Sequence, residues 1–319
     1  MITVLTGGTG GAKFVDGLRQ VIAPEELTVI VNTGDDLLWW GLYVSPDVDS
    51  ITYILAGKLS QERGWGVKGD TFYCLQAMGQ LGQPIWFHAG DRDLATHILR
   101  SKLLAEGKTL TEVTAEIAAR LGVRARILPM SNSRVETRIG TPIGELSFEE
   151  YFVQRWYQDP VESVRFAGAS DAEPAPGVID AIRGAEAVLL APSNPVTSIA
   201  PILAVPGIRE ALRESRARIT AVSPIVGGAA VSGPAGVLMA SQGLKVSIAG
   251  VAEYYSDFLD LLVVDTRDEA AAGELRETGM RVHCTPSIMR TNDDKVGLAA
   301  AVLKAALQPP AAQAAGDRS

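Results

Sequence analysis

Short runs of apolar, often β-branched residues recur along the chain, and each is followed by a turn-rich segment. Several runs are apolar at every position, which is typical of strands covered on both faces of a parallel sheet. The pattern predicts strands at 1–6, 27–32, 84–89, 125–130, 187–194, 219–225, 244–250 and 261–266. It predicts helices at 11–21, 71–81, 93–105, 110–121, 206–215, 234–242 and 294–308. Strands that alternate with helices indicate βαβ units, so we predict an α/β fold with a doubly wound, mostly parallel sheet.

One segment interrupts this alternation. Residues 132–170 alternate between apolar and polar positions around a glycine-containing turn, which predicts a β-hairpin. Together with the helices before it, the hairpin suggests a smaller α+β lobe at 52–170, inserted into a core made of 1–51 and 171–308. Residues 309–319 are short of large apolar side chains, and we expect a disordered tail there.

A glycine-rich loop separates the first predicted strand from the first predicted helix. The sequence TGGTGGAKF contains Gly7, Gly8, Thr9, Gly10 and Gly11. Backbone N–H groups at a helix N-terminus form an anion site, to which Lys13 would add a full charge. The loop does not match the P-loop, which needs Ser or Thr after the lysine, or the dinucleotide pattern, which needs glycine at position 13. A phosphate site and a tight turn without a ligand therefore both remain open.

Carboxylates follow the second predicted strand. Asp35 and Asp36 lie where that strand ends, and the motif SPDVD then supplies Asp47 and Asp49. Open α/β sheets build their sites at the carboxyl ends of strands, so carboxylates from these two loops could hold Mg²⁺ beside a phosphate. Asp47 has a second interpretation, because it follows a serine–proline pair typical of a helix start, where an acid complements the helix dipole.

Three further loops carry candidate residues. The segment GDRDLATH opens a predicted helix and contains Asp91, Arg92, Asp93 and His97. His97 follows Asp93 by four positions, so both can point the same way, although a capped helix with a solvated ion-pair face is equally plausible. The loops APSNPVTSIAPI and VSPIVGGAAVSGPAG suit a nucleotide base or phosphate, unless their side chains bond to their own backbone. Their candidates are Ser193, Asn194, Ser198, Ser223 and Gly227.

Composition narrows the classes of function. The net charge is −8, from 29 basic and 37 acidic side chains, which argues against a nucleic-acid partner. Cys74 and Cys284 are far apart and form no C-x-x-C motif, so we expect neither a disulfide framework nor a structural zinc site. No apolar run approaches the roughly 18 residues of a membrane span, and the first residues lack a secretory signal. We expect a cytoplasmic protein that binds no membrane.

Taken together, the motifs resemble those of the 2-phospho-L-lactate transferase family. The matching stretches are GGTGGAKF, IVNTGDD, SPDVD, RGWG, GDRDLATH, LPMS, APSNPVTSI, SPIVGG, VSGPAG and GVAEYYSDFLD. They occur in the same order from residue 1 to residue 307, so the resemblance covers almost the whole chain. It implies a Rossmann-like core with an inserted lobe, a homodimer, and a role in the biosynthesis of the deazaflavin coenzyme F-420.

The resemblance also implies a reaction and its partners. A guanosine diphosphate-linked three-carbon acid would donate a phospholactyl or phosphoenolpyruvyl group to the ribityl hydroxyl of a deazaflavin (Fo), with release of GMP. The reaction requires Mg²⁺, and the resemblance places the metal-binding aspartates at Asp36 and Asp49. Asp35 and Lys13 are further catalytic candidates. The glycine loop and the two serine-containing loops would bind the donor, while GDRDLATH and the inserted lobe would face the deazaflavin.

Several questions stay open at this stage. A non-catalytic nucleotide-sugar-binding protein of the same superfamily would share the glycine loop, although GDDLLWWGLY favours the transferase. A nicotinamide-dependent oxidoreductase is disfavoured because Lys13 replaces the third glycine. The acid on the donor could be phospholactate, phosphoenolpyruvate or phosphoglycerate. Asp35, Asp91 and His97 are candidate bases for the hydroxyl, and stacking could come from Trp39, Trp40, Trp65 and Trp86, although each of these could equally belong to the core.

Overall fold

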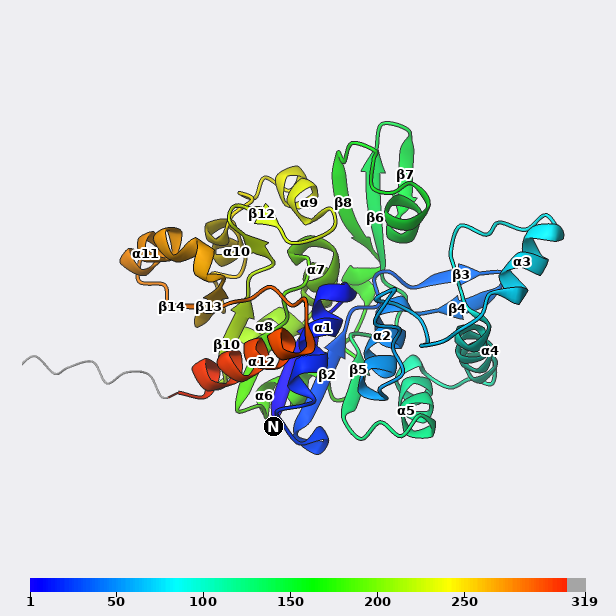
Figure 1. Ribbon diagram of the computed structural model, residues 1–319, viewed down its shortest axis with the longest axis horizontal. Coiled ribbons are helices and arrows are strands. Elements are labelled where there is room, and N and C mark those ends of the chain that lie inside the picture. Colours follow the sequence, from blue (N-terminus) through cyan, green and yellow to red (C-terminus); the bar gives the residue numbers. More distant parts are fainter. Residues whose placement is uncertain (309–319) are drawn as a thin grey trace, which may run out of the picture.

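A parallel sheet of seven strands forms the centre of the protein (Figure 1). The computed structural model describes residues 1–308, so the predicted tail 309–319 lies outside the described residues. The strands are β1 Ile2–Thr6, β2 Leu27–Val31, β5 Arg126–Pro129, β9 Ala187–Leu190, β10 Arg218–Val222, β13 Leu261–Val264 and β14 Val282–Cys284. Their spatial order is β14-β13-β10-β9-β1-β2-β5, and every neighbouring pair is parallel. The predicted Rossmann-like, mostly parallel sheet is confirmed.

The strands are apolar throughout because the sheet is covered on both faces. β1, β2, β9 and β13 are buried at every position. Neighbouring residues of a strand point to opposite faces, so Val4 packs in one core cluster and Leu5 in the other. The helices α1 Gly8–Leu18, α2 Pro46–Leu55 and α12 Asn292–Leu307 cover the Val4 face. The helices α6 Val178–Arg183, α7 Ala200–Ala204, α8 Ile208–Arg213 and α10 Ile248–Tyr254 cover the other.

The remaining helices lie around this core. They are α3 Tyr73–Gln80, α4 Asp91–Ala105, α5 Leu110–Arg120, α9 Ala235–Ser241 and α11 Glu269–Glu277. The longest helix, α12, has 16 residues. Within residues 1–308, no helix combines the length and apolar character needed to cross a membrane.

A second, antiparallel sheet stands apart from the main one, at the top of Figure 1. β6 Glu136–Thr141 pairs with β7 Gly144–Ser147 and with β8 Ser163–Ala167, so the hairpin predicted within 132–170 is present and gains a third strand. Two short hairpins, β3 Leu37–Trp39 with β4 Leu42–Val44 and β11 Ile225–Val226 with β12 Ala229–Ala230, complete the strands. β5 lies inside the range predicted as the lobe, but it pairs with β2 of the main sheet. The division into core and lobe stays a prediction, and this strand belongs to the main sheet.

Two predicted strands are wrong. Residues 84–89 form no strand; Trp86 and Phe87 instead pack with Trp39 in a small separate cluster. Residues 244–250 lead into α10, whose start is capped by the Ser247 side chain accepting from Gly250 N. Short apolar runs do not distinguish strands from helix starts or loops, so pattern alone cannot separate these cases.

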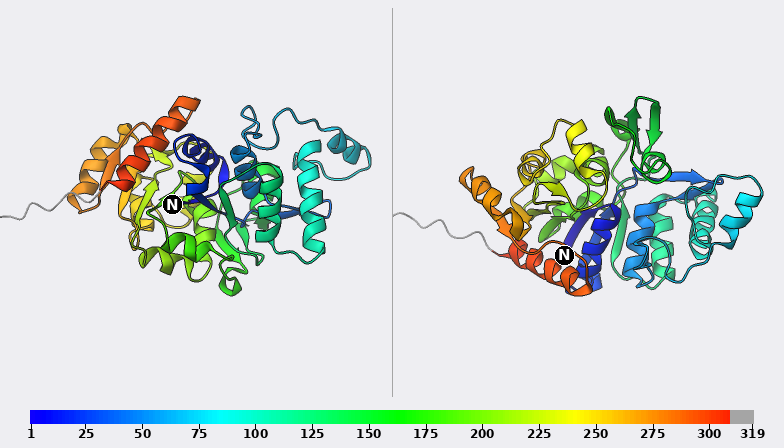
Figure 2. Two further views of the ribbon diagram at one scale, coloured as in Figure 1. Left: turned by 90° about the horizontal axis from the view of Figure 1, so that it is seen from below. Right: turned by 45° about the horizontal axis from the view of Figure 1, so that its top comes forward.

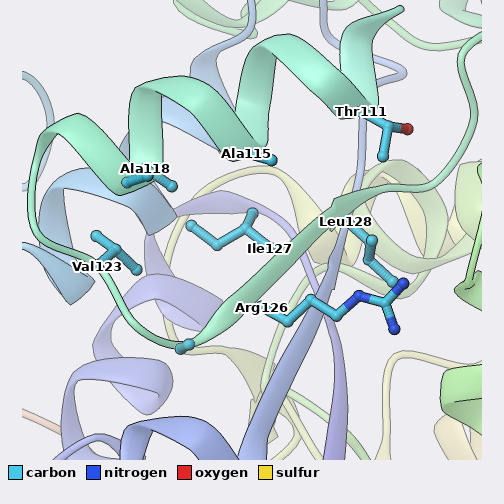
Figure 3. A pocket seen from close by; sticks show the side chains of 9 residues that line it. Thr111, Ala115, Ala118, Val123, Arg126, Ile127 and Leu128 are labelled. Atoms are coloured by element: carbon cyan, nitrogen blue, oxygen red, sulfur yellow. The ribbon is translucent and has the colours of Figure 1, made fainter.

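A small hollow of about 270 Å³ lies between α5 and the edge strand β5 (Figure 3). Its walls are alanine and branched aliphatic side chains, with Arg126 extending along the strand side. No carboxylate, histidine or cysteine lines this hollow.

Candidate active site

A cavity of about 1100 Å³ adjoins the carboxyl ends of the central strands. The strand order reverses between β1 and β9, which is where open α/β sheets bind ligands. Residues from both sides of this reversal, from the second sheet and from the β11–β12 segment line the cavity. The candidates from the sequence that line it are Gly7, Gly8, Thr9, Gly10, Lys13, Asp35, Asp47, Asp49, Asp93, His97, Ser193, Asn194, Ser198 and Ser223. The candidates outside its lining are Gly11, Asp36, Asp91, Arg92 and Gly227.

The glycine loop forms the first turn of α1, which begins at Gly8 and not at residue 11 as predicted. Gly8 has a φ of 67°, a conformation that favours glycine. A Cβ at Gly7 would lie 2.6 Å from Asp47 Oδ2, and one at Gly10 would lie 2.6 Å from the Pro192 carbonyl oxygen. Close packing therefore accounts for these glycines, and their backbone also faces the cavity.

Asp35 and Asp47 are joined through the side chain of Asn32. The Gly8 N–H donates to Asp47 Oδ1 at 2.6 Å, and the Asn32 amide donates at 3.0 Å to both Asp47 Oδ2 and Asp35 Oδ2. Burial raises the pKa of Asp47 to about 6 and the pKa of Asp35 well above its ordinary value, and no cation within residues 1–308 opposes this effect at either group. In the described part of the chain, Asp35 Oδ1 is buried without a hydrogen-bond partner. Asp47 is thus a site residue as well as a first-turn acid of α2.

Asp36 is buried and is not part of the cavity lining. The Tyr43 hydroxyl donates to its Oδ2 at 2.8 Å, and the Ser45 hydroxyl donates to its Oδ1 at 2.6 Å. Burial raises the pKa of Asp36 to about 8, although both hydrogen bonds act in the opposite direction. These bonds join Asp36 to β4 and to the start of α2, the helix that carries Asp47 and Asp49.

Asp49 forms a buried ion pair with Arg100 of α4. Both terminal guanidinium nitrogens bind its carboxylate, one of them at 3.0 Å from Oδ2. His97 lies between two carboxylates, with Nδ1 at 3.5 Å from Asp49 Oδ2 and Nε2 at 3.6 Å from Asp93 Oδ1. The Tyr53 hydroxyl also donates to Asp93, at 2.7 Å.

The side chains of this cluster are also close enough together to be considered as a metal site. Ligand atoms of Asp49, Asp93 and His97 all lie within 4.8 Å of one another. The guanidinium of Arg100 already neutralises Asp49, so an ion-pair network describes the cluster better than a metal centre does. The sequence analysis missed Arg100, although its spacing from Asp93 and His97 places all three on one face of α4.

Three of the candidate residues make hydrogen bonds that stabilise the nearby backbone. Asp91 is half-buried and accepts hydrogen bonds from the Thr71 hydroxyl and from two backbone N–H groups at the start of α3. Arg92 is exposed and donates to the Lys68 carbonyl oxygen at 3.3 Å. Gly227 forms the turn of the β11–β12 hairpin, and its N–H donates to Asp268. A role of these residues in substrate binding stays a prediction.

The segment after β7 contributes a carboxylate that the sequence analysis did not single out. Glu149 lines the cavity and is only 7% exposed. Burial raises its pKa to about 8, with further contributions from the charges of Asp47 and Asp36. The stretch LSFEEYF has no feature that distinguishes Glu149 from the half-buried Glu150 beside it, so only the tertiary structure reveals this residue.

Aromatic side chains line two regions of the cavity. On the second sheet's side, Phe152 is stacked between Phe148 and Tyr157, with ring centroids 5.4 and 5.6 Å apart. On the α4 side, Trp65 and Trp86 line the cavity, whereas Trp39 is buried in the neighbouring core cluster. Flat rings can therefore be accommodated at more than one place.

Basic side chains reach the cavity from the other half of the main sheet. Lys13 projects from α1, Arg267 follows β13 and Arg290 precedes α12, and all three line the cavity. The two arginines were not among the sequence candidates. Carboxylates thus enter the cavity from the segments that follow β2 in the chain, whereas cationic groups enter it from the segments that follow β13 and β14.

Known proteins share both the sequence and the fold. A family profile described as 2-phospho-L-lactate transferase CofD matches residues 2–299. The 2-phospho-L-lactate transferase of Methanosarcina mazei is 41% identical over 302 residues, covering 95% of this chain and 99% of the relative. The 2-phospho-L-lactate transferase of Methanothermobacter thermautotrophicus is 45% identical, with 95% and 97% covered. The phosphoenolpyruvate transferase of Streptomyces griseus is 42% identical, with 96% and 98% covered.

A solved structure has the same fold at low sequence identity. The crystal structure of a UPF0052 family protein from Bacillus halodurans superimposes with a TM-score of 0.62, over 95% of this chain and 98% of that one, at 17% identity. The profile match and the relatives above 40% identity cover almost the entire chain. The chain therefore belongs to the 2-phospho-L-lactate transferase family and is a transferase.

Proposed function

We propose that the protein transfers a phospholactyl or phosphoenolpyruvyl group from a guanosine diphosphate-linked donor to the ribityl hydroxyl of a deazaflavin (Fo), with release of GMP. The observation that carries this proposal is a single cavity in which a helix N-terminus, unpaired carboxylates and aromatic walls meet. Its volume of about 1100 Å³ is above the usual range for one small ligand, as a reaction between two ring-bearing substrates requires. Relatives bear both names, 2-phospho-L-lactate transferase and phosphoenolpyruvate transferase, so the three-carbon acid stays open.

Positioning and charge neutralisation are the main tasks in such a reaction. The hydroxyl oxygen forms a bond to phosphorus while the bond from phosphorus to the GMP oxygen breaks, and the hydroxyl loses its proton. We assign the diphosphate to the first turn of α1 and Lys13, with Ser193 and Ser198 beside them in the lining. Of the candidate bases, Asp35 and His97 line the cavity and Asp91 does not.

The carboxylates of the cavity fit the Mg²⁺ that the family resemblance implies. Among residues 1–308, Asp35 Oδ1 is a buried oxygen without a hydrogen-bond partner, and no cationic side chain forms an ion pair with Asp35 or Asp47. Carboxylate oxygens beside substrate phosphates are the ligands that Mg²⁺ prefers. When bound, the ion would neutralise charge on the diphosphate.

The structure suggests a ligand pair different from the one the sequence motifs suggested. Asp36 is enclosed by Tyr43 and Ser45, and Asp49 is bound to Arg100. We therefore propose that Asp35 and Asp47 hold the ion. Asp36 would position the segment that carries Asp47, and Asp49 would contribute through its network with Arg100 and His97.

The proposal is tested by calorimetric titration of the protein with GDP and with the deazaflavin, each with and without Mg²⁺. We expect the deazaflavin to bind, and GDP to bind in a Mg²⁺-dependent way that Asp35→Asn and Asp47→Asn weaken by about tenfold or more. Glu145→Gln is the matched control, since this carboxylate is exposed on β7 and pairs with Arg165. Absence of binding for both ligands would overturn the proposed function.

A homodimer also belongs to this proposal. Large apolar side chains are exposed on the arm formed by the β3–β4 hairpin, α3 and α4, at the right of Figure 1. They are Leu38, Tyr73, Leu81, Ile85 and Ile98. Exposed apolar groups gathered in one region are typical of association surfaces, and we propose that a second copy of this chain covers them.

A further inference from the structure

The start of α4 is capped by a carboxylate from a distant part of the sequence. The N-cap position of this helix is Gly90, which has no side chain to satisfy the first N–H groups of the helix. The Asp70 carboxylate takes that place: the Arg92 N–H donates to its Oδ1 at 2.8 Å, and the Asp93 N–H donates to its Oδ2 at 3.0 Å. A Cβ at Gly90 would overlap this carboxylate, so the helix start is built around Asp70.

The first residue of α4 provides the reciprocal cap for α3. Asp91 accepts from the N–H groups of Tyr73 and Cys74, at 3.1 and 2.9 Å, and also from the Thr71 hydroxyl. The Asp91 N–H in turn donates to the Thr71 carbonyl oxygen at 2.8 Å. A cap from an adjacent residue would stabilise only its own helix, whereas the caps from Asp70 and Asp91 also join two separate segments of the chain.

Both of the segments that Asp70 joins contribute to the wall of the cavity. The chain before Asp70 supplies Trp65 and Gly66, and the chain around the start of α4 supplies His88 and Asp93. The two segments meet there, because the ring centroids of Trp65 and His88 are 6.4 Å apart and a Cβ at Gly66 would lie 3.8 Å from Asp93 Oδ2. We call these four lining residues the Trp65 wall. Asp70 itself does not line the cavity.

The Trp65 wall suits the ring-bearing acceptor better than the second aromatic region does. In that region, Phe152 Cε2 lies 3.7 Å from where a Cβ of Gly233 would stand, and Gly233 belongs to the loop VSGPAG that we expect to bind the donor. The Trp65 wall instead combines an indole with the imidazole of His88 and the carboxylate of Asp93. An aromatic face beside a few polar groups is the surface that a flat ring with polar edge atoms requires.

We infer that Asp70 is a positioning residue for the deazaflavin, because its carboxylate holds the two halves of the Trp65 wall together without touching the substrate. This inference rests on the proposed function, since it concerns the acceptor of that reaction. Hydrogen bonds from two N–H groups to separate oxygens of one carboxylate fix both distance and orientation, so the acceptor meets a preformed slot. Within residues 1–308, the Asp70 carboxylate bonds to the N–H groups of Thr71, Arg92 and Asp93 and to no group of the glycine loop. Loss of Asp70 should therefore affect the acceptor and spare the nucleotide.

The test compares two ligands on Asp70→Asn, by calorimetric titration of the full chain with the deazaflavin (Fo) and with GDP plus Mg²⁺. Asparagine has one acceptor oxygen in place of two, so one of the two N–H bonds at the start of α4 is lost. We expect Fo binding to weaken by about tenfold or more, as when a hydrogen bond to a charged group is removed, and GDP to bind as it does to the wild type. Glu112→Gln is the matched control, because this carboxylate accepts the Thr109 N–H at the start of α5, outside the cavity lining. It should lower stability and change neither affinity.

The outcomes separate this inference from the proposed function. If Asp70→Asn binds Fo as tightly as the wild type does, the positioning role of Asp70 is overturned and the proposed function stands. Equal weakening of Fo and GDP would also overturn that role, because the variant would then disturb the cavity as a whole. If the wild type binds neither ligand, the proposed function fails as well. Should Asp70→Asn fail to fold, Asp70→Glu decides, since it keeps the charge on a longer side chain and is expected to weaken Fo binding while GDP binding persists.

Discussion

Neighbouring aspartates in this protein have different surroundings and therefore different tasks. Asp35 faces the cavity with one oxygen unpaired, while Asp36 is enclosed by two hydroxyl groups. Asp47 accepts the Gly8 N–H, and Asp49, two positions later on α2, binds Arg100. Each assignment depends on which partner the fold brings to the carboxylate, since the side chains are chemically identical.

The charge of Glu149 predicts how stability depends on pH. Burial raises its pKa from the ordinary 4.5 to about 8, and the carboxylates of Asp47 and Asp36 add to the effect. A raised folded-state pKa means that the folded protein holds the proton more tightly, so this contribution is complete below pH 4.5 and is lost as the pH rises to about 8. We expect the free energy of unfolding of the cation-free protein to fall over this interval and Glu149→Gln to reduce the slope.

Urea denaturation in EDTA at several pH values between 4.5 and 8 measures this slope. Asp35 and Asp36 act in the same direction, so part of the slope should persist in Glu149→Gln. Equal slopes for the variant and the wild type would contradict the prediction.

The helices α1 and α4 both contribute polar groups to the cavity lining. α1 begins directly after β1, and its glycine turn lies against Asp47 and Pro192 with no space for a Cβ. α4 presents Asp93, His97 and Arg100 on one face, toward α2 and the cavity. The structural role and the site role of these segments coincide, because the groups that line the cavity also hold the two helices in place.

The close packing of the glycine turn predicts the effect of Gly7→Ala. Its Cβ would lie 2.6 Å from Asp47 Oδ2 and 2.9 Å from Asn32 Cβ, so we expect a loss of about 1–3 kcal/mol of unfolding free energy and weaker GDP binding. Gly273→Ala is the matched control, because Gly273 lies in α11 with open space around it and should be neutral or stabilising by up to about 1 kcal/mol. Denaturation and calorimetry check both variants, and unchanged stability in Gly7→Ala would count against this packing argument.

The Arg100 network predicts a non-additive pair of variants. Arg100→Met would leave Asp49 buried without a partner, at a cost of about 3–5 kcal/mol of unfolding free energy. Adding Asp49→Asn removes the uncompensated charge, so the double variant should be more stable than Arg100→Met alone. A double-mutant cycle by chemical denaturation measures the coupling, and simple additivity would show that the two side chains do not interact.

The arrangement of the main sheet explains why distant stretches of sequence form one site. The order β5-β2-β1-β9-β10 brings the loops after β1, β2 and β9 to the same edge, and the second sheet adds Glu149 and its aromatic neighbours (Figure 2). The arm with α3 extends away from this edge, with Leu81 and Tyr73 exposed on it.

The exposed arm predicts how association can be disrupted. Leu81 is 73% exposed, and Leu81→Glu would place a charge in the proposed contact between two copies. We expect this variant to be monomeric in size-exclusion chromatography with light scattering, whereas Ile143→Glu, on the β6–β7 turn, should remain dimeric. A wild-type monomer would contradict the proposed homodimer, and a dimeric Leu81→Glu would place the contact elsewhere.

Patterns among neighbouring residues were enough to predict the type of sheet and the family. The all-apolar runs indicate a parallel sheet, and the motifs from GGTGGAKF to GVAEYYSDFLD indicate the family, which the comparisons confirm. Segments such as 84–89 and 244–250 are misassigned because an apolar run is compatible with a strand, a loop or a helix start. The aspartate motifs could be recognised in the sequence, but not that Asp36 lies outside the cavity lining while Asp35, Asp47 and Asp49 belong to it.

Burial and charge pairing depend on residues that are distant in the sequence. These two properties determined which charged side chains belong to the candidate site. Arg100 pairs with Asp49 across 51 positions of sequence, and Glu149, from the segment after β7, lines the same cavity as Asp47 of α2. No local pattern specifies that one glutamate of FEEYF enters a cavity while the next bonds to Ser147. The chain's residues supplied the sheet, the glycine-rich turn and the family, whereas the tertiary structure selected the charged groups that line the cavity, because desolvation and pairing arise only when distant segments meet.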